Sequence, residues 1–118
     1  MRIRICLGAA LAILSSAARA ADANRGRQVF QACAACHGDK GGDLGPSLVG
    51  VAGRKAASLE NFRYSPAMMR SNIVWNDANL HAFLVNPQAK VKGTRMPYEG
   101  LGESQDVDDV IAYLKTLK

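Results

Sequence analysis

The feature that most constrains this chain is a stretch of five residues, Cys33-Ala34-Ala35-Cys36-His37. Residues three apart lie on one face of a helical turn, so both thiols can reach the two vinyl groups of one porphyrin. The histidine follows at once, where its imidazole can bind the iron as the proximal ligand. This spacing is the attachment signal of c-type haem. It therefore predicts a fold that forms around one haem, bound covalently through Cys33 and Cys36.

Two other uses of a Cys-x-x-Cys pair fit the sequence less well. A structural zinc site needs about four ligands, and beyond His37 the chain offers only His81 and Cys6. A thioredoxin-like dithiol belongs next to a βαβ pattern, which the flanking sequence does not have. Haem attachment remains the favoured interpretation.

The first twenty residues are predicted to be an export signal that is cleaved. Two arginines precede an apolar run over residues 5–14, and Ala18-Arg19-Ala20 supplies small residues before a cut that would make Ala21 the mature N-terminus. The run is shorter than the about 20 residues that span a bilayer, although retention as an uncleaved anchor stays open. Covalent haem attachment in bacteria takes place outside the cytoplasmic membrane. Both features therefore indicate the periplasm, with no stable membrane insertion of the mature protein.

Cleavage would leave residues 21–118, which is enough for a single small domain. Three arginines leave with the signal, so the net charge falls from +5 to about +2, and two ionised haem propionates would cancel that remainder. Nothing here suggests nucleic acid as a partner. A domain of this size has little core to spare, so we expect the porphyrin to supply the centre of the core.

Every element that the sequence predicts with a start signal is a helix. A helix capped by Asp22 or Asn24 runs into the haem motif, and Ser65-Pro66 opens a short helix through Met69. Asn76 or Asp77 caps a third helix, which ends before Pro87. Ser104 is expected to cap the last one, in which apolar residues recur at helical intervals: Val107, Val110, Ile111, Leu114 and Leu117. Lys40 to Pro46 is glycine-rich and reads as a loop. The predicted class is all-α, in one domain.

The sixth ligand of the iron decides between electron transfer and ligand chemistry. The candidates are Met68, Met69, Met96 and His81. Met96 sits in a loop, Gly93 to Pro97, where a methionine has no evident core role, so a ligand role explains it best. Met68 and Met69 lie on a predicted helix, where methionine is more often core filler, and His81 is expected to lie at or near the surface. We therefore predict His37 and Met96 as the two metal ligands.

The mature chain resembles the class I cytochromes c of the mitochondrial-like kind, from Gly26 to Leu117. The resemblance rests on Gly26 and Phe30 in the first helix, Tyr113 in the last, Gly45-Pro46, Asn86-Pro87 and the methionine loop. It implies a small fold in which the N- and C-terminal helices cross at the glycine, and loops wrap the haem. It also implies that a carbonyl of the Gly45-Pro46 loop accepts a hydrogen bond from the proximal histidine.

The same resemblance implies a set of further haem contacts. The segments Gly53 to Lys55 and Asn61 to Ser65 resemble those that hold the buried propionates. The residues expected to contact the haem besides its ligands and thioethers are Pro46, Arg54, Tyr64, Ser65, Trp75 and Thr94.

The chain departs from the family pattern at three places. Phe83 stands where a tyrosine usually bonds to the methionine sulfur, and Met68 replaces an asparagine of an internal water network, so the distal side should be drier. The loop between His37 and Pro46 is about three residues shorter than in the mitochondrial proteins. The family has a ring of lysines around the exposed haem edge, and fewer of its positions carry a cation in this chain. The remaining candidates are Arg27, Lys90, Lys92 and Arg95.

The resemblance implies a soluble periplasmic one-electron carrier that turns over no substrate and is a monomer. Its redox partners would be a quinol-oxidising complex, a terminal oxidase or a dehydrogenase. Two alternatives remain open: a dedicated electron-accepting subunit of one such complex, and a haem enzyme or sensor with an open sixth site.

Overall fold

The computed structural model describes residues 8–12, 19–38 and 40–118. Most of the predicted signal, residues 1–7 and 13–18, therefore lies outside the described residues. The described chain contains five helices: α1 (Ala23–His37), α2 (Pro66–Arg70), α3 (Asp77–Val85), α4 (Pro87–Lys90) and α5 (Ser104–Leu114). Among these residues there is no strand, only one isolated bridge between Lys55 and Val74. The all-α prediction is confirmed, and no helix in the described part has the length and apolar character of a membrane span.

The predicted caps explain where most of these helices begin. The carboxylate of Asp22 accepts the backbone N–H groups of Asn24 and Arg25, and α1 begins at the next residue, Ala23. Ser65 caps α2 ahead of Pro66. Asn76, the first of the two predicted alternatives, caps α3 by accepting the N–H of Asn79.

Several details differ from the sequence prediction, among them the end of the last helix, which was expected to include Leu117 but ends at Leu114. Ser104 was expected to cap the last helix, but it is the first residue of α5, and Glu103 holds the cap position without a side-chain hydrogen bond. Asp106, in the first turn, favours the positive end of the helix dipole in place of a side-chain cap. The one-turn helix α4 was not predicted; Asn86 caps it and Pro87 begins it.

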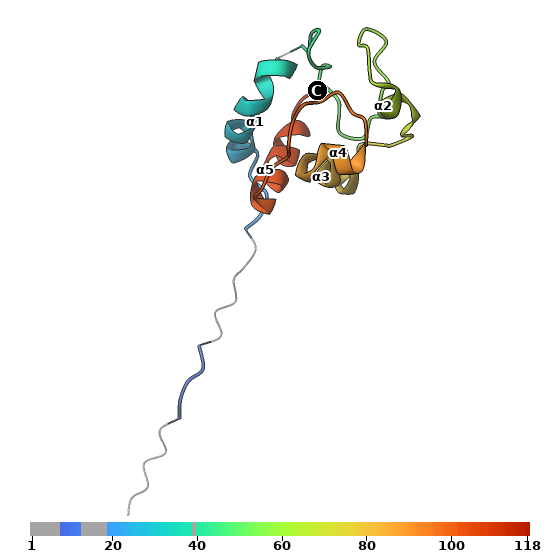
Figure 1. Ribbon diagram of the computed structural model, residues 1–118. Coiled ribbons are helices and arrows are strands. Elements are labelled where there is room, and N and C mark those ends of the chain that lie inside the picture. Colours follow the sequence, from blue (N-terminus) through green and yellow to red (C-terminus); the bar gives the residue numbers. More distant parts are fainter. Residues whose placement is uncertain (1–7, 13–18, 39) are drawn as a thin grey trace, which may run out of the picture.

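The terminal helices α1 and α5 cross at close range and lie side by side in Figure 1. The crossing depends on Gly26, because a Cβ atom there would collide with the backbone carbonyl oxygen of Asp109 in α5. Beside it the rings of Phe30 and Tyr113 pack with centroids 5.1 Å apart. The predicted crossing at this glycine is confirmed.

The buried core joins α5 to α1 and α3. Val107 and Val110 of α5 are fully or almost fully buried, and α3 contributes Leu80, Phe83 and Leu84 as predicted. A salt bridge of 2.8 Å from Lys115 to Asp77 connects the end of α5 to the start of α3. Together the helices form a frame that is open on one side, where the loops between α1 and α3 complete the wall of a cavity.

Candidate haem-binding site

The site is one cavity of about 550 Å³, which lies among α1, α3, α5 and the loops. That volume falls within the range of cofactor pockets. All ten residues predicted to hold the haem line it: Cys33, Cys36, His37, Pro46, Arg54, Tyr64, Ser65, Trp75, Thr94 and Met96. The fold thus brings together residues from every part of the chain between α1 and the methionine loop.

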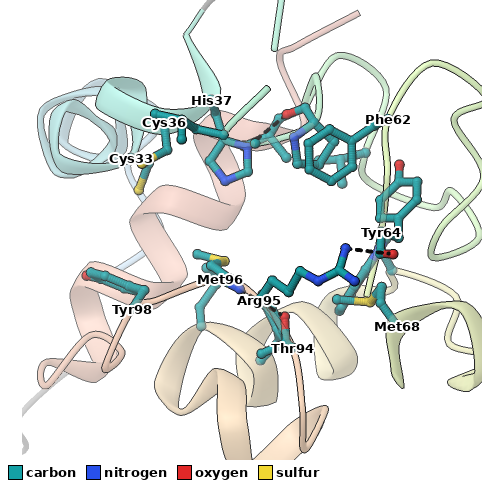
Figure 2. A pocket seen from close by; sticks show the side chains of 18 of the residues that line it. Cys33, Cys36, His37, Phe62, Tyr64, Met68, Thr94, Arg95, Met96 and Tyr98 are labelled. Atoms are coloured by element: carbon teal, nitrogen blue, oxygen red, sulfur yellow. Dashed lines mark hydrogen bonds between the residues drawn. The ribbon is translucent and has the colours of Figure 1, made fainter. Parts of the chain in front are cut away.

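The two cysteines lie on the last turns of α1, on one side of the cavity (Figure 2). Both are free, Cys33 half-buried and Cys36 exposed. Burial, and then the neighbouring Cys36, raises the pKa of the Cys33 thiol above its usual value. In the described part of the chain no three metal-binding side chains cluster as a cage. The two thiols instead stand beside a cavity large enough for a porphyrin.

His37 ends α1 and turns its ring into the cavity (Figure 2). Its Nδ1 lies 2.8 Å from the backbone oxygen of Pro46. A carbonyl can only accept, so Nδ1 carries the proton and Nε2 is left with a lone pair facing the cavity. Gly45 is required beside this bond, because a Cβ atom there would come within 2.9 Å of Nδ1. The hydrogen bond implied by the family resemblance is present.

Met96 rises toward His37 from the opposite side of the cavity (Figure 2). Its backbone N–H donates to the Thr94 hydroxyl at 3.4 Å, which helps to position the loop. The other candidate ligands lie elsewhere or on another wall. Met69 is 66% exposed and outside this cavity, and His81 pairs with Asp108 at 3.9 Å on the outside of α5. Met68 lines the cavity but stands beside Tyr64, away from His37 (Figure 2).

All the residues expected near the propionates line the cavity, but Arg54 and Ser65 already have protein partners. The Arg54 guanidinium donates to the carbonyls of Val49 and Ser47 at 2.8 and 2.9 Å. The Ser65 hydroxyl accepts the N–H that caps α2. Arg54 can therefore lend its charge to this wall while it also ties two loop carbonyls in place, a role that the sequence does not reveal.

Several lining residues were not singled out from the sequence as contacts. Leu44 and Tyr98 also line the cavity, Tyr98 on the side of Cys33 (Figure 2), and Phe62 packs against Tyr64, with ring centroids 4.9 Å apart. Leu44 is 77% exposed. Their residue types do not indicate a haem contact in the sequence. Whether a loop residue lines the cavity depends on where the folded loop lies.

The side chains present fit a covalently bound haem with two axial ligands. Two thiols stand on one wall, an imidazole faces a thioether across the space, and the other walls are largely apolar. Phe83 packs its ring on Trp75 with centroids 5.1 Å apart. It presents no hydroxyl to the distal side, in agreement with a drier pocket.

Comparisons with known proteins point the same way. The family model described as cytochrome c matches residues 23–118. The chain is 45% identical to a cytochrome c2 of Rhodoblastus acidophilus over 84% of its own length and 95% of that protein. It is 44% identical to a cytochrome c homolog of Rickettsia felis over 83% of its length, but the match spans only 58% of that relative. Cytochrome cH from Methylobacterium extorquens superposes with a TM-score of 0.78 at 41% identity, covering 80% of this chain and 98% of that one.

Proposed function

The chain belongs to the cytochrome c family, and from this premise we propose that it is an exported one-electron carrier with His37 and Met96 as axial ligands. Members of the family carry electrons and turn over no substrate, and they bind one haem c covalently. In this chain Cys33 and Cys36 are the attachment residues. The observation that carries the proposal is that His37 and Met96 face each other across the cavity beside both thiols.

The haem, when bound, supplies a one-electron iron couple. The protein's own part is to hold two ligands still, so that little rearranges between the oxidation states. The bond from His37 to the Pro46 carbonyl fixes the imidazole ring and makes it a stronger donor. A methionine thioether opposite it raises the potential. The largely apolar walls exclude water from both ligands.

We place the mature protein, residues 21–118, in the periplasm, after cleavage that follows Ala20. Its partners would be a quinol-oxidising complex, a terminal oxidase or a dehydrogenase. The exposed rim near Cys36, Leu44 and Tyr98 is where such a partner would approach the haem edge. Capture of periplasmic proteins on the haem-loaded chain, followed by electron-transfer assays with each captured protein, tests which of these it serves.

The ligand assignment has a spectroscopic test. Oxidised protein should show the weak near-infrared absorption band of sulfur bound to ferric iron, and Met96→Ala should abolish it. Met68→Ala is the matched control, since that methionine lines the same cavity without facing His37. A band that persists in Met96→Ala and is lost in the control would refute the assignment.

The attachment residues have an independent test. With Cys33→Ser and Cys36→Ser together, acid-acetone extraction should remove all haem from the protein. Haem that stays bound after this treatment would mean that the covalent link lies elsewhere.

A further inference from the structure

Outside the haem site, the structure contains one buried carboxylate with an unusual set of partners. Asp109 of α5 is fully buried at the crossing with α1. Its Oδ1 accepts the backbone N–H of Asp22 at 2.8 Å and the side-chain amide of Gln105 at 3.0 Å. Among the described residues, its Oδ2 accepts only from the guanidinium of Arg19, at 2.7 Å. Burial raises the pKa of this carboxyl, but the hydrogen bonds and the Arg19 charge outweigh it, so the pKa lies below its usual value.

Arg19 is the residue that maturation would remove. It lies two positions before Ala21, and the inference rests on the proposed cleavage after Ala20. Cleavage would take away the one cation paired with Asp109 and leave Oδ2 without its donor. A buried charge that loses its partner is strongly unfavourable. In the mature fold Oδ2 would therefore be free to accept a replacement cation.

Cleavage itself creates a cation on the residue before Asp22, whose backbone nitrogen contacts Asp109. The new α-ammonium would be on Ala21, and consecutive backbone nitrogens are separated by only about 3 to 4 Å. The nitrogen of Asp22 already lies 2.8 Å from Asp109 Oδ1. A free N-terminus, no longer held by a preceding peptide, can turn its ammonium toward the carboxylate.

We propose that Asp109 is the receptor for the N-terminus of the mature chain, and that cleavage exchanges the Arg19 guanidinium for the Ala21 ammonium at one buried carboxylate. The first residue of the mature protein is thereby part of the crossing of α1 and α5. A terminus cut one or two residues away would carry its charge to the wrong place.

The test uses haem-loaded protein made with defined N-termini, so it does not depend on where cleavage occurs in the cell. The first form begins at Ala21 with a free amine, and the second is the same protein acetylated there. Each is made with and without Asp109→Asn. Asp108→Asn is the matched control, an exposed carboxylate on the same helix. These four proteins form a double-mutant cycle, which isolates the interaction free energy between the amine and Asp109.

We expect acetylation to raise the unfolding equilibrium constant in urea at least tenfold in the unsubstituted and Asp108→Asn proteins, and less than twofold in Asp109→Asn. An acetylated form that begins at Arg19 should recover the lost stability, and Arg19→Gln should remove it again. Equal effects of acetylation with and without Asp109→Asn would overturn the proposal.

If Asp109→Asn does not fold, the Ala21 amine can be titrated in the unsubstituted protein. Pairing should raise its pKa above the usual value near 8, and an unraised pKa would overturn the proposal. Other charges face the same corner: Asp22, which lies 3.7 Å from Arg19, and the Arg25–Asp106 pair at 3.4 Å. The pKa of the Ala21 amine is therefore measured both in the unsubstituted protein and in Asp22→Asn. An intact mass that does not correspond to a start at Ala21 would instead refute the proposed cleavage alone.

Discussion

At the scale of single residues, the haem site depends on a few side chains whose freedom is removed by backbone contacts. His37 is oriented by one carbonyl, and that carbonyl is placed by a loop in which Gly45 passes beside the ring. The identity of a ligand is thus a local property, whereas its orientation belongs to a loop nine residues away. Substitutions that spare the ligand but move the loop should therefore change the potential.

Gly45→Ala is expected to raise the reduction potential by tens of millivolts. A Cβ at Gly45 would press on Nδ1 of His37 and lengthen its bond to Pro46, so the imidazole becomes a weaker donor to the ferric state. A hydrogen bond is worth about 1 kcal/mol net, and 59 mV is a tenfold change for one electron. Gly42→Ala is the control, because no atom lies near its Cβ position. Protein-film voltammetry measures both; an equal shift in the two variants would contradict the argument.

Met96 should keep its place to more alkaline pH than the methionine of mitochondrial-like relatives. In the family, a deprotonated lysine of the methionine loop displaces the sulfur, and the two matching positions here are Ala89 and Arg95. Alanine has no ligand atom, and arginine stays protonated at any accessible pH. The lysines nearest to Met96 along the chain are Lys90, the last residue of α4, and Lys92, just beyond it, and neither lines the cavity. Lys55 lines the cavity, but it lies outside the methionine loop.

The measurement is a pH titration of the near-infrared band beside a relative that keeps both lysines. Loss of the band at the same or a lower pH would show that a lysine reaches the iron here too. Lys90→Ala and Lys92→Ala would then show which one.

At the scale of elements, the contact between α1 and α5 positions two walls of the cavity. α1 carries both thiols and His37, while α5 presents Val110 and Leu114 to the same space. The distance between these helices therefore sets the width of the site, and the absence of a side chain at Gly26 sets that distance.

Gly26→Ala should destabilise the haem protein by about 1–3 kcal/mol, the range for overpacked cores. Alanine would favour the helix by about 1 kcal/mol, but the new Cβ collides with backbone, the Asp109 carbonyl, which cannot turn aside. Urea unfolding followed by far-UV circular dichroism gives the difference. Gly102→Ala, with open space around its Cβ position, should change little. A Gly26→Ala protein as stable as the control would mean that the helices can separate at no cost.

At the scale of the whole molecule, the cavity and the net charge matter most. Core residues of α3 and α5, among them Phe83 and Val110, line the cavity of about 550 Å³. A group that fills the cavity would bury their apolar surface, at about 25 cal/mol per Å². The porphyrin would thus be a structural part of the core, so we expect the apoprotein to be poorly folded.

Electron transfer to an acidic partner should depend only weakly on ionic strength. The net charge of residues 21–118 is about +2, which two ionised propionates would cancel, and the family resemblance implies few cations at the haem edge. Salt screens the electrostatic attraction that speeds association. Because this attraction is weak here, added salt should slow electron transfer only slightly. Stopped-flow rates between 10 and 150 mM salt test this. A rate that falls more than about tenfold would reveal a concentrated basic face that the net charge hides.

The sequence by itself determined the features that depend on near neighbours in the chain. The spacing of Cys33, Cys36 and His37 specifies haem attachment because one helical turn sets it, and the caps at Asp22, Ser65 and Asn76 act within three residues. The family resemblance added the crossing at Gly26 and the identity of the lining residues. Their roles toward the haem remain predictions, as does the cleaved signal.

The tertiary structure alone decided what depends on groups far apart in the chain. Asp109 reads from the sequence as one of several acids favouring the start of a helix, yet it is fully buried and paired with Arg19, ninety positions away. Arg54 reads as a propionate partner, yet it also holds two loop carbonyls. The physical reason is the same in both cases. A charged side chain takes the partner that burial puts beside it, and burial is set by how the helices and loops pack, which no local pattern of residues encodes.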